Sequence, residues 1–337
     1  DWEKIFGGTL HDEASSIQQT NDGGYIVAGF TVSSDKNISE NNGSSDYWII
    51  KLNPDGTIDW EKSYGGGRGE YAYSIEQTLD RGYIIAGLSY SNDGDISENK
   101  GESDYWIIKL NPDGTLDWEK SFGGSDRDEA YSIQQTNDGG YIVAGFTLSG
   151  DGDISGSKKY SYDYWIIKLS PDGTLDWEKS FGESTYSGAN SIQQTNDGGY
   201  IVAGFTSSVE DVTEAYGGYD YRIIKLNADG TIEWKRNYGG REGGKATSIQ
   251  LTNDGGYIVA GYSNSSDSYV SENKGGYDYW ILKLSSAGKI QWEQSFGGSR
   301  DDIANCIEQT NDDGYIVVGR SASFDGDVSE NNGGSDF

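Results

Sequence analysis

Hydrophobic and polar residues follow one pattern that recurs six times along the 337 residues of the chain. In the third copy, four short segments rich in Ile, Val, Tyr and Trp stand out, at residues 130–136, 141–147, 163–170 and 175–181. Segments of this length and composition, separated by Gly, Asp and Asn, predict β-strands, and no stretch has helical periodicity. We therefore predict an all-β protein with four antiparallel strands per copy, labelled a, b, c and d in that order.

Two turn motifs connect the predicted strands. Residues 137–140 read Asn-Asp-Gly-Gly, which predicts a two-residue hairpin between strands a and b because positive φ costs little there. Residues 111–114 of the second copy read Asn-Pro-Asp-Gly, which predicts a tight turn between strands c and d because proline presets φ. The longer connections, from b to c and from d to a, are then expected together at the opposite end of the strands.

The repeats divide the chain into six parts that leave almost nothing outside them. They cover residues 1–58, 59–116, 117–175, 176–232, 233–290 and 291–337. We predict a single six-bladed β-propeller, because ladder hydrogen bonds stay within a copy while aromatic side chains pack between copies. The N-terminal strand, Trp2 to Phe6, is expected to close the last blade as its outer strand. The last repeat stops where strand c should begin, so we expect it to be truncated.

Two motifs carry a family resemblance. Residues 172–177 read Asp-Gly-Thr-Leu-Asp-Trp, and Gly-Gly-Tyr-Ile-Val-Ala-Gly recurs at the start of strand b. This pattern resembles the repeat propellers of secreted bacterial and archaeal surface proteins and, more distantly, quinoprotein-like propellers. The resemblance covers all six copies and implies a scaffold, adhesion or binding role without a specific activity.

Composition narrows the range of partners. The 55 acidic and 25 basic residues give a formal charge of −30, which repels nucleic acid and anionic membrane surfaces. No apolar run approaches the roughly 20 residues of a membrane helix, so we expect no membrane insertion. The chain contains no Met and begins inside a repeat motif, as expected of a processed or excised segment. We expect a secreted or cell-surface protein, and this chain to be part of a longer one.

The loops between strands b and c contain a calcium-like spacing. In the second copy, oxygen ligands stand at loop positions 1, 3, 5, 7 and 12, and the sixth copy repeats them. These residues are Asp93, Asp95, Ser97, Asn99 and Asp104, and Asp325, Asp327, Ser329, Asn331 and Asp336. Two interpretations stay open: the loops bind Ca²⁺, or the side chains form Asx turns and begin strand c. One His and one Cys exclude an ordinary zinc or iron site, and no organic cofactor is indicated.

Residues that differ between copies are the candidates for binding. Four tyrosines in the variable loops are expected to stack on sugar rings or to anchor a protein partner: Tyr71, Tyr160, Tyr186 and Tyr216. Scattered exposed aromatics are also ordinary in so aromatic a chain. Arg222 replaces the strand c Trp of other copies; a ligand contact and local repacking, with the charged head in water, are the alternatives.

Two hypotheses for function follow from these observations. The first is an extracellular or cell-surface binding or structural module that recognises glycan or protein in adhesion, with Ca²⁺-ordered loops. The alternative is a carbohydrate-active hydrolase or lyase that uses acidic residues of the loop face, such as Asp128 and Glu129. Whether the protein is an enzyme stays open, and the near-identical copies without a catalytic outlier favour the binding module.

Overall fold

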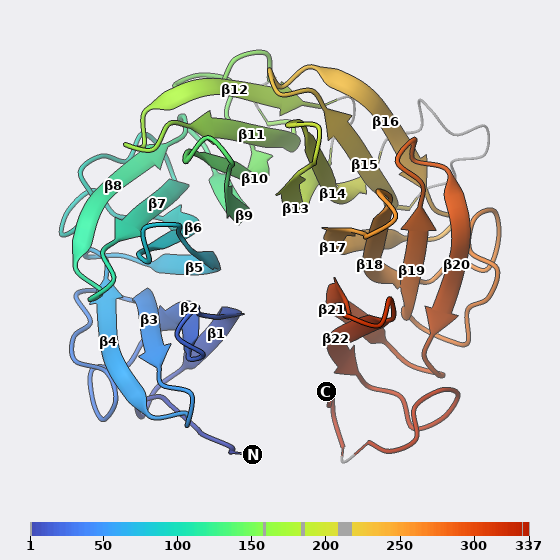
Figure 1. The fold of residues 1–337 in the computed structure, drawn as a ribbon, viewed down its shortest axis with the longest axis horizontal. Coiled ribbons are helices and arrows are strands. Elements are labelled where there is room, and N and C mark those ends of the chain that lie inside the picture. Colours follow the sequence, from blue (N-terminus) through green and yellow to red (C-terminus); the bar gives the residue numbers. More distant parts are fainter. Residues whose placement is uncertain (1, 158–159, 183–185, 208–217, 332, 337) are drawn as a thin grey trace. The chain divides into compact units, whose positions relative to one another are not determined.

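The computed structural model describes residues 2–157, 160–182, 186–207, 218–331 and 333–336, whose course is drawn in Figure 1. All regular structure in these ranges is β-strand, as predicted, and therefore no helix in them could cross a membrane. The chain divides into two units, one of residues 1–161 and 165–180 and the other of residues 162–164 and 181–337.

The first unit contains three antiparallel sheets of four strands, each in chain order. The first sheet is β1 (Asp12–Gln19), β2 (Tyr25–Thr31), β3 (Asp46–Leu52) and β4 (Ile58–Tyr64). The second is β5 (Glu70–Gln77), β6 (Tyr83–Ser89), β7 (Asp104–Leu110) and β8 (Leu116–Phe122). The third is β9 (Asp128–Gln135), β10 (Tyr141–Thr147), β11 (Asp163–Leu169) and β12 (Leu175–Phe181), of which residues 163, 164 and 181 fall in the second unit.

The second unit contains two four-stranded sheets and one strand pair. The first of these sheets is β13 (Ser187–Gln194), β14 (Tyr200–Thr206), β15 (Asp220–Leu226) and β16 (Ile232–Tyr238). The next is β17 (Gly244–Leu251), β18 (Tyr257–Ser263), β19 (Asp278–Leu284) and β20 (Ile290–Phe296). The pair is β21 (Asp302–Gln309) and β22 (Tyr315–Ser321), so the predicted strands match closely, and strand b of the third copy matches at both ends.

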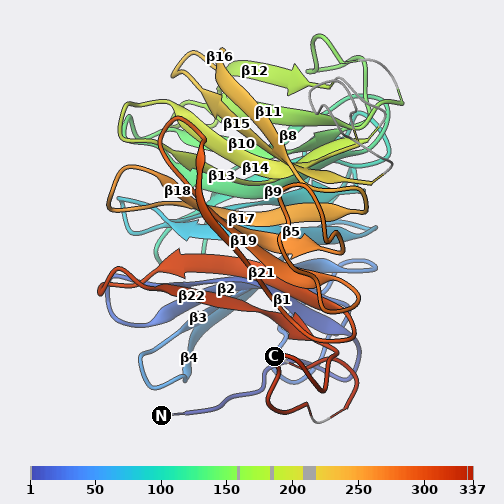
Figure 2. The same ribbon diagram turned by 90° about the vertical axis from the view of Figure 1, so that its right-hand side faces the viewer.

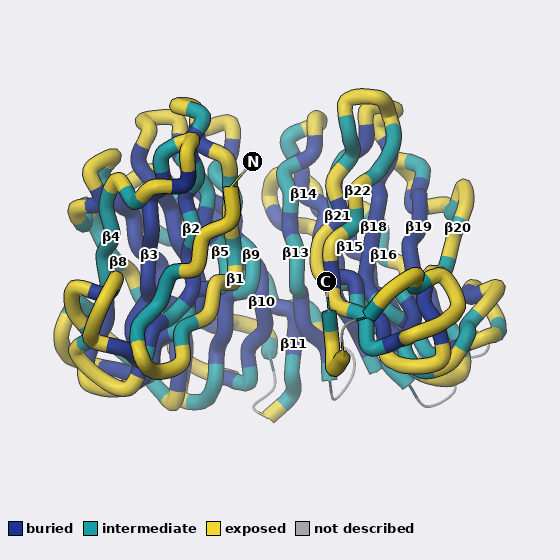
Figure 3. The backbone as a smooth tube through the Cα atoms, turned by 90° about the horizontal axis from the view of Figure 1, so that it is seen from below, coloured by how far each residue is buried: buried dark blue, intermediate teal, exposed yellow. Residues whose placement is uncertain are grey.

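Consecutive sheets within a unit pack face to face through strand c. Every residue of β7 is buried, whereas β8 alternates between partly buried and exposed residues; Figure 3 shows the same contrast between β19 and β20. The Tyr105 hydroxyl donates to the carbonyl of Trp165, 2.9 Å away in the next sheet, and Tyr221 donates to that of Trp280 at 2.8 Å. Four-stranded antiparallel sheets that repeat in this way are the blades of a β-propeller.

A bulge in strand a recurs in each copy and demands glycine in strand b. Between β9 and β10 the register shifts at Ala144 and Gly145. A Cβ atom on Gly145 would lie 1.9 Å from the carbonyl oxygen of Glu129, much closer than any real contact. Glycine is therefore required because the two backbones approach so closely at the bulge.

The turn between strands a and b differs from the prediction. Five residues, 136–140, separate β9 from β10, and of these only Gly139 has a positive φ, of 84°. The carboxylate of Asp138 accepts hydrogen bonds from the Thr136 hydroxyl and from the Gly140 amide. The two-residue hairpin was wrong because this side chain closes a longer turn, in which a single left-handed glycine suffices.

The expected closing strand at the N-terminus is also wrong. The described residues 2–11 form no strand, and the Trp2 indole instead donates to the carbonyl of Pro54 at 3.0 Å. The Trp2 ring lies 5.8 Å from Tyr25 in a T-shaped arrangement, much as Trp60 lies 5.7 Å from Tyr83. The segment packs against the first sheet much as the strand d of one sheet packs against the next sheet. A strand also needs a hydrogen-bonded neighbour, and the described part of the sixth copy forms β21 and β22 without a strand c to pair with it.

Candidate functional site

The variable loops of each unit meet at one end of its strands, which we call the loop end; it comprises the connections from d to a and from b to c. In the second copy, the Gly67 amide donates to Asp93 Oδ1 at 2.7 Å, and the Arg68 amide donates to Ser91 Oγ at 2.8 Å. These bonds tie a d–a connection to a b–c connection, as predicted for the two loop sets. Figure 2 shows connecting segments at both ends of strands such as β17 and β18; the loop end is the end with the d–a and b–c connections.

Tyr71 is part of an aromatic group at the loop end of the first unit. It is the second residue of β5, and its ring lies 4.8 Å from that of Phe30 in a T-shaped contact. Phe30 is in turn 5.4 Å from the His11 ring. Tyr71 remains partly exposed, so one side of the group is available to a ligand.

Tyr186 belongs to a larger group in the second unit, here called the tyrosine cluster: Tyr162, Tyr186, Phe205, Tyr219 and Lys245. Tyr186 lies 4.0 Å from the Tyr162 ring and 5.7 Å from the Tyr219 ring. The Lys245 ammonium sits 3.9 Å from the centroid of Phe205 and 4.6 Å from that of Tyr219. Burial lowers the pKa of Lys245, so the rings hold a partly desolvated cation.

Lys245 was not among the predicted site residues, although the sequence contained a signal. It is the second residue of strand a, and this position differs strongly between copies: Glu13, Tyr71, Glu129, Gly188, Lys245 and Ile303. Its contact with Phe205 joins strand a of one copy to strand b of the preceding copy. Only the spacing between copies in the structure reveals this contact.

The other two predicted tyrosines are placed differently. Tyr160 is 73% exposed, with φ at 69°, and its amide donates to the carbonyl of Leu148 at 3.0 Å. Tyr216 lies outside the described residues. Tyr71 and Tyr160 fall in the first unit and Tyr186 in the second, so no common site for them is inferred.

Arg222 is the departure from the repeat that the structure explains in part. Its side chain is only 1% exposed, so the interpretation with the charged head in water is wrong. The guanidinium lies 6.0 Å from the Tyr164 centroid, and Nη1 is 3.4 Å from Thr206 Oγ1. Arg222 is thus held inside the sheet and not aimed at a ligand from solvent.

The calcium-like loop of the second copy uses its side chains as backbone acceptors. Asp93 and Asp95 accept from Gly67 and Gly65 of the preceding d–a connection, at 2.7 and 3.0 Å. Asp104 Oδ2 accepts instead from its own loop, from the Lys100 amide at 2.8 Å. Asn99 donates to Ser89 O and accepts from Gly101 N, whereas Ser97 is exposed.

The sixth copy repeats most of this arrangement. Asp325 accepts from Ser299 N at 2.7 Å, and Asp327 accepts from Gly297 N at 3.1 Å. Asn331 bonds Ser321 O and Gly333 N, and Ser329 is exposed. Asp336 pairs through its backbone with Ser321, as a residue that begins strand c would.

These hydrogen bonds involve the predicted calcium ligands but do not test whether the loops bind Ca²⁺. Within the described ranges, no group of three or more His, Cys, Asp or Glu is arranged to hold a metal ion. The loop carboxylates accept from the preceding d–a connection or from their own loop, and the spacing within one loop does not reveal these partners. Calcium binding at these loops stays a prediction.

The structure brings together a set of carboxylates that the sequence spacing did not indicate. Beside Gly123, a Cβ atom would lie 2.4 Å from Asp104 Oδ1 and 2.9 Å from Asp128 Oδ2. Asp153 Oδ2 accepts from the Gly123 amide at 3.0 Å. Burial, with Asp128 nearby, raises the pKa of Asp104 to about 7, and burial raises that of Asp128 to about 6. Equivalent sets surround Gly65 and Gly297, where Asp46 and Asp278 also have raised pKa values of about 6.

The acidic pair named for the hydrolase alternative is engaged in structural contacts. Asp128 is fully buried and accepts from the Thr147 hydroxyl, from Ser149 Oγ at 2.9 Å and from Gly124 N at 2.8 Å. Glu129 is 4% exposed; it pairs with Arg127 and accepts from the Tyr131 hydroxyl at 2.8 Å. Both carboxylates are engaged in hydrogen bonds or an ion pair within the protein. This disfavours a catalytic role in which they would contact a substrate.

Comparison with known proteins supports the architecture. A family model described as a domain of unknown function (DUF5122) beta-propeller matches residues 20–59. The sequence is 22% identical to the regulatory protein FlaEY of Caulobacter vibrioides over 96% of this chain, which covers 38% of that protein's length. Together with the repeated four-stranded sheets, the family model identifies the chain as a β-propeller.

Two solved structures are similar to this chain at low sequence identity. The WD40 domain of Neurospora crassa Pan2 gives a TM-score of 0.47 at 11% identity, covering 91% of this chain and 74% of that one. The propeller domain of the Trilobed protease from Pyrococcus furiosus gives 0.42 at 12% identity, covering 82% and 69%.

Proposed function

We propose that the protein is an extracellular or cell-surface binding module, a six-bladed propeller within a longer surface protein. Its repeated residues build the blades, and its variable loop-end residues bind a ligand. Of the two partner classes expected from the sequence, a glycan and a protein, we favour the glycan. Partly exposed tyrosine rings offer flat apolar faces at little conformational cost, as a sugar ring requires.

The tyrosine cluster is the observation that carries this proposal. Tyr186 and Lys245 come from positions that differ between copies, so these two side chains are not needed to build a blade. Tyr186 is fixed by a parallel bridge to Tyr162, and the Ser187 amide donates to the Tyr162 carbonyl at 2.8 Å. The rings are therefore preorganised, which lowers the entropy cost of binding.

Binding to an array of uncharged glycans tests the proposal. We expect the protein to bind a subset of them, and Tyr186→Gly to weaken binding by about tenfold or more, the cost of losing a central aromatic contact. Copies two and five carry Gly at this position, as Gly69 and Gly243, so the variant is expected to fold.

Leu79→Ser provides the matched control. Leu79 is 81% exposed in an a–b turn, away from the loop end, so its removal also deletes exposed apolar surface. Equal losses from both variants, or no binding by the unaltered protein, would argue against the tyrosine cluster as a glycan site.

A further inference from the structure

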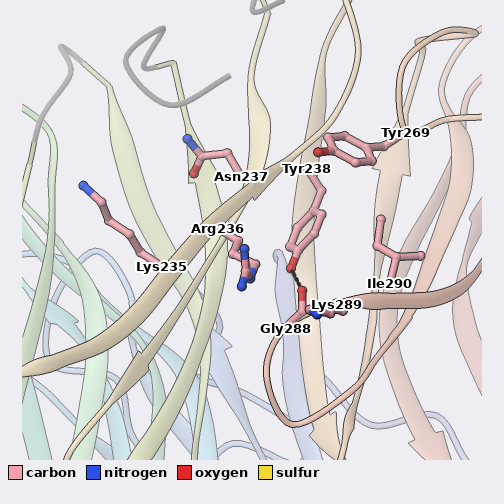
Figure 4. A pocket seen from close by; sticks show the side chains of 8 residues that line it. All are labelled: Lys235, Arg236, Asn237, Tyr238, Tyr269, Gly288, Lys289 and Ile290. Atoms are coloured by element: carbon pink, nitrogen blue, oxygen red, sulfur yellow. Dashed lines mark hydrogen bonds between the residues drawn. The ribbon is translucent and has the colours of Figure 1, made fainter. Parts of the chain in front are cut away.

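A groove of about 420 Å³ lies between two consecutive sheets of the second unit, and its lining residues include none of the tyrosine cluster. Figure 4 shows its walls: Lys235 to Tyr238 from β16, Tyr269 from a b–c loop, and Gly288 to Ile290 from a c–d turn. Arg236 and Tyr238 point toward the turn, whereas Lys235 and Asn237 extend to the other side of the strand.

Compared with the sister positions in other copies, this groove has lost acidic side chains and gained a basic one. The sister position of Tyr269 is an acid in the second, third and sixth copies, namely Asp95, Asp153 and Asp327. Ala287 replaces the turn aspartate of the first four copies, and Lys289 replaces their threonine. The sister positions in the third copy combine Lys120 with two acids, Asp153 and Asp172. The described residues that line this groove include Arg236 and Lys289 and no acid.

The Arg236 side chain of β16 is held in place by two contacts. Arg236 Nε donates to the Ala287 carbonyl at 3.2 Å, and the guanidinium lies 5.9 Å from the Trp234 centroid. Its two Nη groups have no hydrogen-bond partner among the described residues and are available to a ligand. A planar guanidinium fixed in this way matches two oxygens of a carboxylate or sulfate.

The remaining wall is aromatic and rigid. The Tyr238 hydroxyl donates to the Gly288 carbonyl, and the Tyr238 ring lies 5.8 Å from Tyr269. Tyr269 is 46% exposed, so one face of its ring borders the groove. Lys289, also exposed, adds a second positive charge on the turn.

We propose that this groove binds a sulfate or carboxylate group carried by a saccharide, with Arg236 and Lys289 contacting the anion and Tyr269 packing on the sugar ring. Its volume falls in the range of small-ligand sites, which is about 300 to 1,000 Å³. On a chain with a net charge of −30, such a local excess of positive charge gives selectivity for an anion. The inference does not depend on the tyrosine cluster, which belongs to other elements.

Calorimetric titration with a sulfated oligosaccharide tests the groove, with its desulfated counterpart and inorganic sulfate as parallel ligands. The double variant Arg236→Gln/Lys289→Thr carries residues found in sister copies, Gln294 and Thr231, and is therefore expected to fold. We expect it to weaken binding of the sulfated oligosaccharide by about tenfold or more, as the loss of charged hydrogen bonds implies. Binding should also weaken as ionic strength rises.

The variant Lys120→Gln/Lys179→Gln is the matched control, because it changes the net charge equally at sister positions of Arg236. Unchanged affinity in this control supports the groove as the site. Equal weakening in both double variants, or no binding by the unaltered protein, overturns the proposal. Equal affinity for inorganic sulfate or for the desulfated chain overturns the assignment of a saccharide-borne anion.

Discussion

Asp104, at the start of β7, uses its two carboxylate oxygens in different ways. Oδ2 accepts from the Lys100 amide at 2.8 Å and so shapes the loop. Oδ1 is buried without a hydrogen-bond partner among the described residues, close to Asp128 and Asp153. The Lys100 ammonium, 2.6 Å from Asp153, is the cation that partly offsets this negative charge. A residue that in the sequence resembles a metal ligand is thus a buried acid that is costly to ionise.

The raised pKa of Asp104, about 7, predicts how stability depends on pH. A carboxyl whose pKa is higher in the folded state favours folding while it is protonated and loses this contribution as pH rises through the folded pKa. We therefore expect the free energy of unfolding to fall as pH rises from about 4 to about 7, between the ordinary and the folded pKa of Asp104. Asp104→Asn, which is neutral throughout, should make this dependence shallower and add about 1–3 kcal/mol at pH 8, while Asp46, Asp128 and Asp278 still titrate in the same range.

Urea unfolding at several pH values measures this effect, and Glu102→Gln serves as control because Glu102 is exposed. The acids with lowered pKa values, such as Asp254 at about 2, change stability only below about pH 4 and leave this window undisturbed. A pH dependence that is the same in Asp104→Asn as in the unaltered protein would show that Asp104 does not titrate in this range.

At the scale of elements, the a–b turn of each four-stranded sheet is held to strand c by an ion pair with a buried lysine. Lys283 of β19 is 5% exposed and places its ammonium 2.9 Å from both oxygens of Asp254 in the turn before β18. The same pairing links Lys51 to Asp22 and Lys109 to Asp80. The turn motif was predicted as a simple hairpin, because its lysine partner lies about 29 residues away in the sequence.

The sixth copy provides an internal comparison for this contact. Asp312 makes the same hydrogen bonds to its turn, from Thr310 and Gly314, without a lysine partner among the described residues. We expect Asp254→Asn to lower the free energy of unfolding by about 1–3 kcal/mol, because it leaves the buried Lys283 without its counter-charge.

Asp312→Asn should change stability by less than about 0.5 kcal/mol, as is usual for an exposed site. Chemical denaturation of the two variants at pH 7 makes the comparison. Similar losses in both would mean that the turn hydrogen bonds, and not the lysine contact, provide the stabilisation.

At the scale of the molecule, the sequence predicts the features that repeat in every copy, but not the contacts that form between copies. Strands b, c and d of the third copy were located within a residue because apolar alternation and turn residues are local signals. The tyrosine cluster and the carboxylates around Gly123 join different copies, so their members are far apart in the chain. The closing role of Trp2 to Phe6 failed for the same reason, since it required a strand partner that the local pattern does not contain.

The central claim is that the residues repeated in every copy build the blades, whereas the residues that vary between copies bind glycans. Glycan-array binding by a variant in which the variable side chains take residues of sister copies tests it most directly. This variant combines Tyr71→Glu, Tyr186→Gly, Lys245→Glu, Arg236→Gln and Lys289→Thr. We expect its melting temperature to stay within about 5 °C of the original and its binding to neutral and sulfated glycans to be lost. A variant that keeps its fold and still binds the same glycans would contradict the account.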